Sequence, residues 1–301
     1  MKLPSSEHLK KTLKVDDKIL ARFWQIRKDT INQAKKLNQK KTKLVALGIS
    51  GSARDHNDMA QEDSNSEFLL GQALAKLKSL GAQTEIIKLR NYNIKPCKAC
   101  YSTVNTQCHF YCSCYPKGTA TADDMSNILY DKILAADIII FATPVNNFKI
   151  SSFMALFIDR CISLDGSLEP ADLKFPKNRE LNIKHTKFIQ LTADQKIPGS
   201  GFLRRFMGKA GGIIVTGHEA GAALTISQMM MTLTHFGMSF SGWSNMYAVS
   251  TVTRPTFFDK KFVNTEFFSE DAREVAQNAF TLAKALSKMD KTVWQHDYIT
   301  N

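Results

Sequence analysis

The chain has 301 residues, of which 44% are hydrophobic, and a formal net charge of +12. No apolar run reaches the roughly 20 residues that a membrane-spanning helix needs. Charged residues from Lys10 to Lys18 fall where a signal peptide would have its apolar core. We therefore expect a cytoplasmic protein. Its six cysteines would then be thiols, redox groups or metal ligands rather than disulfides.

The positive charge is concentrated near the N-terminus. Residues 1–43 hold 13 Lys or Arg and four Asp or Glu, so the remaining body is nearly neutral. Apolar and small residues in this stretch recur at helical spacing: Ile19, Phe23, Ile26, Thr30, Ala34 and Leu37. This pattern predicts that residues 1–42 form a basic helical extension, docked on its own domain or on a partner subunit. A patch for nucleic acid or for a membrane surface is the less favoured alternative.

From residue 43 to residue 301 predicted strands alternate with predicted helices. Strand patterns lie at 44–49, 84–89, 136–142, 211–217 and 243–249. Helix patterns lie at 66–80, 151–163, 222–236 and 269–289, the last with Ser269 as its N-cap. This order predicts a doubly wound α/β domain with a five-stranded parallel sheet in the order 2-1-3-4-5. Residues 164–208 are predicted to be an irregular insertion.

Two segments rich in Gly and Ser flank the first predicted crossover. Gly48-Ile-Ser-Gly-Ser-Ala-Arg54 leaves the first strand, and Ser64-Asn-Ser66 opens the next helix. A helix N-terminus offers unpaired N–H groups and a positive dipole end to a phosphate. The candidate phosphate contacts are Ser50, Ser52, Arg54, Ser64, Asn65 and Ser66. An ordinary Gly/Ser turn is the alternative.

Two further loops follow predicted strands. Thr143-Pro-Val-Asn-Asn-Phe148 comes after the strand at 136–142, and Val215-Thr-Gly-His-Glu-Ala-Gly221 ends the strand at 211–217. Ligands of open α/β sheets bind outside such carboxyl ends. With the phosphate segment, these loops resemble those of the flavodoxin-like NAD(P)H-dependent FMN reductases and the related iron–sulfur flavoproteins. The resemblance implies ring contacts from Pro144, Val145, Asn146, Asn147 and Phe148, and from Thr216, Gly217, His218 and Gly221.

The resemblance also implies a function. We expect an FMN-dependent NAD(P)H oxidoreductase that passes hydride from the nicotinamide to FMN. The electrons would go on to a small-molecule acceptor of quinone, flavin or metal type. No side chain is required as general acid or base, so none is named. Related reductases form homodimers or homotetramers, and neither a membrane nor nucleic acid is expected as a partner. The alternatives are an iron–sulfur flavoprotein, or a flavodoxin-like electron carrier without NAD(P)H turnover.

Five cysteines form a cluster in the sequence: Cys97, Cys100, Cys108, Cys112 and Cys114. A [4Fe–4S] cluster is one of three interpretations, because iron–sulfur flavoproteins bind such a cluster through closely spaced cysteines in this place. The wider spacing between Cys100 and Cys108 leaves a zinc S4 site and unligated thiols as alternatives. If a cluster binds, we expect Cys97 and Cys100 among its ligands. We also expect the segment to lie near the flavin rim. Cys161 is interpreted as a packing residue.

Overall fold

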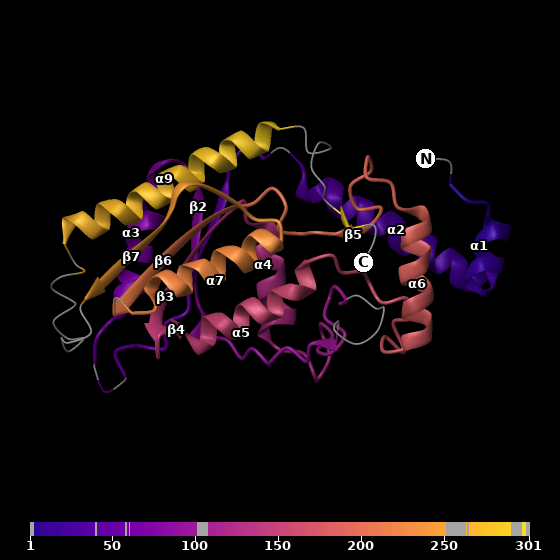
Figure 1. Cartoon of the computed structure of the whole chain (residues 1–301), viewed down its shortest axis with the longest axis horizontal. Helices are drawn as coiled ribbons and strands as arrows, with labels where there is room; N and C mark the ends of the chain where they lie inside the picture. Colours follow the sequence, from indigo (N-terminus) through magenta and orange to yellow (C-terminus); the bar gives the residue numbers. More distant parts are fainter. Residues whose placement is uncertain are drawn as a thin grey trace.

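Five parallel strands form the central sheet of the computed structural model (Figure 1). They are β1 (Val45–Ser50), β2 (Gln83–Lys88), β3 (Ile138–Asn146), β6 (Ala210–His218) and β7 (Ser239–Ser250). Their order is β2-β1-β3-β6-β7, which confirms the predicted order of a flavodoxin-like fold. The structure describes residues 3–39, 41–57, 59, 61–100, 108–218, 220–250, 263, 265–289 and 297–298.

Helices cover both faces of the sheet. The helices α3 (Asn65–Ser79) and α9 (Glu266–Lys288) pack on one face. The helices α4 (Tyr130–Ala135), α5 (Ser152–Arg160) and α7 (Ala222–His235) pack on the other, as Figure 1 shows. Because both faces are covered, the central strands are continuous apolar runs; in β3, Ile138–Phe141 are almost fully buried.

The helices differ from the predicted ones in one boundary and in one additional element. The helix α9 begins at Glu266 with Thr265 as its N-cap, so the predicted cap at Ser269 is wrong and Ser269 is buried inside the helix. The reason is Phe268, whose side chain packs into the apolar cluster under α9 and extends the helix by a turn. Before β3, a π-helical turn (Met125–Leu129) leads into α4, an element that the sequence pattern did not indicate.

The N-terminal helices pack with the insertion at 164–208. That insertion contains α6 (Arg179–Thr192) and β5 (Phe202–Leu203), so the predicted irregular course is wrong. The strand β5 pairs with β8 (Asp297–Tyr298). Figure 1 shows α1 (Ser6–Leu13), α2 (Asp17–Leu37) and α6 at the end of the molecule opposite β4 (Lys149–Ile150).

These three helices surround an apolar cluster of their own, which includes Leu9, Phe23, Phe188 and Phe202. The apolar face predicted for the N-terminal helix is therefore covered within the same chain. Most of its residues, Phe23, Ile26, Thr30 and Ala34 among them, are buried. No helix within the described residues has the length and apolar composition needed to cross a bilayer.

Candidate functional site

The carboxyl ends of β1, β3 and β6 bring three loops to one edge of the sheet. The register pairs Ser50 with Ala142 and Thr143 with Val215, so the three strands end side by side. Hydrogen bonds then tie the loops together. The Gly51 N–H donates to Ala142 O at 2.8 Å, and the Ser151 hydroxyl donates to Gly51 O at 2.7 Å. A Cβ on Gly51 would lie 2.7–2.8 Å from atoms of Met154 and Ser151, so this approach requires glycine.

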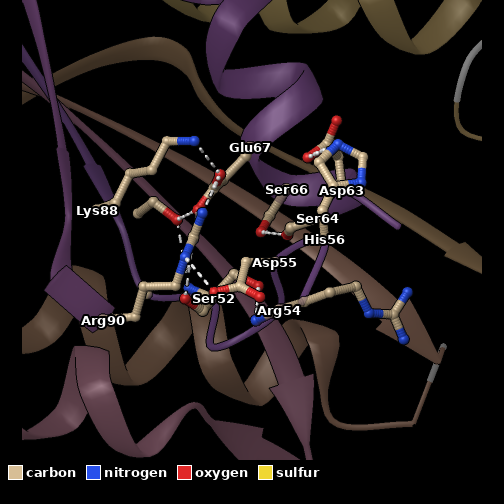
Figure 2. Close-up of polar contacts among 12 residues, drawn as sticks. Ser52, Arg54, Asp55, His56, Asp63, Ser64, Ser66, Glu67, Lys88 and Arg90 are labelled. Atoms are coloured by element: carbon tan, nitrogen blue, oxygen red, sulfur yellow. Dashed lines mark hydrogen bonds and ion pairs between the residues drawn. The ribbon is translucent and has the colours of Figure 1, made fainter. Parts of the chain in front are cut away.

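The first loop brings polar groups together at the start of α3 (Figure 2). Ser64 is the N-cap, but its hydroxyl lies 2.9 Å from the Ser66 hydroxyl and does not cap the helix. The first-turn N–H groups of α3 therefore receive no cap from Ser64. The Ser52 hydroxyl accepts from the Arg54 N–H at 3.2 Å, and Figure 2 shows the Arg54 guanidinium extending away from Glu67. Backbone donors, hydroxyls and a guanidinium are the donor set that suits a phosphate dianion.

A buried carboxylate lies beneath this loop and was missed by sequence reasoning. Glu67 accepts from the Ser50 hydroxyl at 2.7 Å and from Arg90 Nη2 at 3.2 Å, and Lys88 Nζ lies 3.0 Å from its Oε2. Arg90 Nη1 also contacts Glu67 Oε1 and donates to Ser52 O at 3.4 Å. The Ser50 hydroxyl is thus committed to Glu67. Figure 2 shows Lys88 and Arg90 pointing to this carboxylate.

The charges of this network hold each other in the ionised form. Burial alone would raise the pKa of the Glu67 carboxyl. Hydrogen bonds from Arg90, Ser50 and Lys88 outweigh burial, so the Glu67 pKa lies below its ordinary value. The hydrogen bond to Glu67 likewise raises the pKa of Arg90. Lys88 pairs with Ser50 in the adjacent strand, so the end of β2 places a basic residue beside the loop, and no local sequence pattern indicates this pairing.

The second loop is a tight hairpin. Val145 pairs with Ile150 and Asn146 with Lys149, so β3 turns back into β4. The two turn residues, Asn147 and Phe148, have φ of 50° and 64°, as in a type I′ turn. Asn tolerates this left-handed region, whereas a bulky Phe adopts it rarely. The Phe148 side chain is 62% exposed at the tip. A cleft of about 540 Å³ lies between this hairpin and α5.

The third loop packs directly against the hairpin. Gly221 has φ +94°, and a Cβ there would lie 2.6–2.7 Å from backbone atoms of Phe148. Gly217 has φ +135°, and a Cβ there would lie 3.3 Å from Val145. Thr216 is buried and pairs with Pro144. His218 ends β6, and its side chain lies outside the described part of the structure.

Four of the five clustered cysteines contact one another. Cys114 Sγ lies 3.7 Å from Cys100 Sγ, Cys100 also hydrogen-bonds Cys108, and Cys112 hydrogen-bonds Cys114. The contact with Cys108 raises the pKa of Cys100 to about 11. Cys97 instead accepts from the N–H of Ala99 at 3.4 Å. Within the described ranges, no group of three or more His, Cys, Asp or Glu side chains has the arrangement of a metal site.

The described part of the cysteine segment lies along α5 and the insertion. Cys108 O accepts from the N–H of Leu168 at 3.3 Å, and Lys95 O accepts from Arg160 at the C-terminal end of α5 at 2.8 Å. The three loops described above surround the other end of α5, at Ser151. About 13 Å of helix separates the two ends. The described part of the segment thus lies toward the end of α5 away from Ser151, and the expected place of the whole segment at the flavin rim stays a prediction. Cys161 is fully buried, as a packing residue would be.

Comparisons with known proteins agree with this geometry. A family model described as NADPH-dependent FMN reductase matches residues 44–248. An iron–sulfur flavoprotein of Archaeoglobus fulgidus is 33% identical over 121 residues, and one of Methanosarcina thermophila is 31% identical over 121 residues. Each alignment covers 40% of this chain, and it covers 52% and 54% of the two relatives, about half their lengths.

Among solved structures, RosB with bound 8-demethyl-8-formylriboflavin-5'-phosphate is similar in fold. The TM-score is 0.58 over 83% of this chain and 82% of RosB, at 18% sequence identity. The family model covers the sheet from β1 to β7 and all three loops at its edge. The chain therefore belongs to the NADPH-dependent FMN reductase family.

Proposed function

We propose that this chain is an FMN-dependent oxidoreductase that uses NAD(P)H as its reductant. The observation that carries the proposal is the interlocking of three loops at one sheet edge. Gly51, Gly217 and Gly221 permit contacts there that a side chain would block. The uncapped start of α3 supplies donors for a phosphate, and the exposed Phe148 supplies an aromatic surface for a ring system.

The residues of this chain would bind and orient the cofactor. Asn65 and Ser66 would donate backbone N–H groups to the phosphate, with Ser52, Ser64 and Arg54 around it. Pro144 to Phe148, and Thr216 to Gly221, would contact the ring from two sides. Bound FMN would supply the transfer of hydride from the nicotinamide and of electrons to an acceptor. No acid or base of the chain is needed for that chemistry.

The roles within the phosphate loop follow from the buried network. Ser50 is committed to Glu67, so we assign it to support of the loop rather than to direct phosphate contact. Arg90 holds Ser52 O and Glu67 together, and Lys88 adds a second cation behind them. The acceptor class stays open among quinones, flavins and metal centres.

The test is reduction of the FMN-loaded protein without oxygen. We expect full-length protein to bind FMN, and NADH or NADPH to bleach the flavin absorbance, which a quinone then restores. Bleaching by dithionite but by neither nicotinamide would favour the electron-carrier alternative. Failure to bind FMN at all would overturn the site itself.

A metal centre in the cysteine segment is a second candidate. The contact of Cys100 with Cys114 supports it, because their Sγ atoms lie 3.7 Å apart and thiolates on one tetrahedral zinc lie roughly 3.8 Å apart, although the described side chains do not by themselves form a metal site. Iron and zinc analysis of protein purified without oxygen tests it. We expect Cys100→Ser to lose the metal and Cys161→Ser to keep it. Metal-free wild-type protein would leave the thiols unligated.

We also propose a homo-oligomer, as related reductases suggest. Because the apolar face of α2 is covered within the chain, the contact between subunits would lie on another surface. The exposed side chains of Met231 on α7 and of Trp243 and Tyr247 on the edge strand β7 are the candidates. We expect Met231→Lys with Trp243→Lys to lower the mass seen in sedimentation, and an unchanged mass would contradict this surface.

A further inference from the structure

A basic cleft lies apart from the three loops, between residues 95–98 and 113–121 on one side and residues 174–178 on the other. Its volume is about 690 Å³, and its walls include Lys95, Lys98, Lys174, Lys177, Tyr115 and Phe175. The described residues that line it include no Asp or Glu. We call it the lysine cleft. Four lysines line this one cavity, so an occupant of opposite charge would stabilise the arrangement.

Cations crowd around the aromatic wall of the lysine cleft. The Nζ atoms of Lys95 and Lys98 lie 5.6 and 5.4 Å from the centroid of the Tyr115 ring, and the Arg160 guanidinium lies 4.6 Å from it. Lys95 Nζ also donates to the carbonyl of Thr121 at 3.1 Å. A neutral ring and a carbonyl dipole lower the energy of these cations but do not neutralise them.

The carboxylate of Asp123, which lies near these cations, already has other partners. Asp123 is fully buried, contacts Arg160, and accepts from the N–H groups of Lys95 and Ser126 at 2.8 and 3.1 Å. Across the part of the chain that the structure describes, the side chains of Lys98, Lys174 and Lys177 have no carboxylate partner. Residues 101–107, which follow Cys100 in the sequence, contain no Asp or Glu. Asp172, whose carboxylate accepts from the backbone N–H groups of Lys174 and Phe175 at 2.8 and 3.1 Å, offsets part of the charge, and the described residues of the cleft keep an excess of positive charge.

We propose that the lysine cleft binds a small polyanion, one with two or more phosphate or carboxylate groups. A volume of about 690 Å³ lies within the range of about 300–1,000 Å³ typical of small-molecule sites. The N-terminus of α6, where Asn178 lines the cleft, adds the positive end of a helix dipole. Phe175 is 70% exposed on the wall and offers a ring to any organic part of the ligand.

The site is separate from the proposed phosphate loop. The lysine cleft borders the C-terminal end of α5, where Arg160 contacts Lys95, and it borders the start of α6. Figure 1 shows α6 at the end of the molecule opposite β4. Cys114 also lines the cleft, so a bound anion would lie beside the contacting thiols. The inference thus adds a second ligand to the chain and does not depend on FMN binding.

The experiment is calorimetric titration of full-length protein with pyrophosphate, citrate and ADP at low salt, in the presence of excess FMN. We expect at least one of these anions to bind with a dissociation constant below about 1 mM. Lys98→Gln with Lys177→Gln should weaken that binding about tenfold or more, because two charge-assisted contacts are lost. Lys36→Gln with Lys78→Gln removes two exposed lysines elsewhere and is the matched control.

The outcomes separate this site from the phosphate loop. Binding that persists in Ser66→Asp, whose helix start repels anions, places the ligand outside that loop. Preference for pyrophosphate and ADP over citrate would identify phosphate as the recognised group. Equal binding of all three would show that the cleft accepts phosphate and carboxylate polyanions alike. If none of the three anions binds, or if the Lys98/Lys177 variant binds as tightly as the control, the proposal is wrong.

Discussion

Charge at the phosphate loop is arranged in two layers. The upper layer holds Ser52, Ser64 and Ser66 at the start of α3, and the lower layer holds Glu67 between Lys88 and Arg90. A carboxylate so close to a phosphate site would be unfavourable by itself. Its two cationic partners offset the Glu67 charge, although Asp55 also lies 4.0 Å from Arg90 Nε, so the lower layer screens the carboxylate from an anion above it.

The upper layer is tested by Ser66→Asp. The new carboxylate would lie at the helix N-terminus where the phosphate is expected, and repulsion of about 2 kcal/mol would weaken FMN binding roughly thirtyfold. Fluorescence titration measures this. Ser66→Asn is the control of similar size without the charge. Equal FMN retention in the two variants would contradict the placement, and riboflavin, which lacks the phosphate, should discriminate between them much less.

The lower layer is tested by Glu67→Gln. Removal of the charge takes the shared carboxylate away from the half-buried Arg90 and from the more exposed Lys88, at a cost of about 2 kcal/mol in the free energy of unfolding at pH 7. The folded pKa of Glu67 is lowered, so its contribution is present above the unfolded value of about 4.3 and is lost as the pH falls through the folded value. Urea unfolding should therefore show wild type and variant converging at acid pH.

A double variant separates pairing from packing. If Glu67 acts mainly by compensating Arg90, then Glu67→Gln with Arg90→Gln should cost less than the sum of the two single variants. Strictly additive costs would mean that each residue acts through other contacts. Neither residue was predicted as part of the site. The contact joins α3 to the end of β2, and such a long-range pairing leaves no local pattern in the sequence.

At the scale of elements, the strand ends were predictable and the shapes of the loops were not. Runs such as Ile138–Phe141 mark a buried parallel strand, and the residue after each run falls at the ligand-binding edge. The hairpin at Asn147–Phe148 lacks the Asn-Gly signal of a type I′ turn, so it read as an open loop. The helix α6 was missed because polar residues, His185 and Thr186 among them, occupy its buried face.

The packing of the third loop on the hairpin is tested by Gly221→Ala. The added Cβ would clash with the backbone of Phe148 and sit at φ +94°, so the hairpin must shift. We expect FMN binding to fall about tenfold, on the view that a small misplacement of a binding loop is costly. Equilibrium titration with FMN measures the loss.

Gly71→Ala is the matched control within the same fold. Gly71 lies inside α3, and a Cβ there would meet nothing within 4 Å. Since alanine favours a helix interior over glycine, this variant should gain up to about 1 kcal/mol of stability and keep its FMN affinity. Equal FMN affinities for the two variants would argue against a role of the loop contact.

At the scale of the molecule, the N-terminal helices and the insertion at 164–208 share one apolar core. These two segments were predicted separately from the sequence. His185 lies at the centre of this core, stacked on Phe23 with ring centroids 4.6 Å apart and close to Phe188. Its Nε2 has no hydrogen-bond partner among the described residues. Burial lowers the pKa of His185 to about 3, with a smaller contribution from His109. The folded protein therefore keeps this ring neutral at physiological pH.

This burial makes the shared core sensitive to acid. The unfolded histidine binds a proton below about pH 6.5 and the folded one does not, so stability falls as the pH drops from 6.5 toward the folded value. Between pH 7 and pH 5 the loss amounts to about 2 kcal/mol.

We expect His185→Phe, which keeps an aromatic ring and removes the titration, to flatten this dependence of stability on pH. The exposed His8→Gln should leave it unchanged. Hydrogen exchange should locate the acid-sensitive opening in α1, α2 and α6 while the central strands stay protected. Parallel pH profiles for wild type and His185→Phe would show that another group governs the acid response of this core.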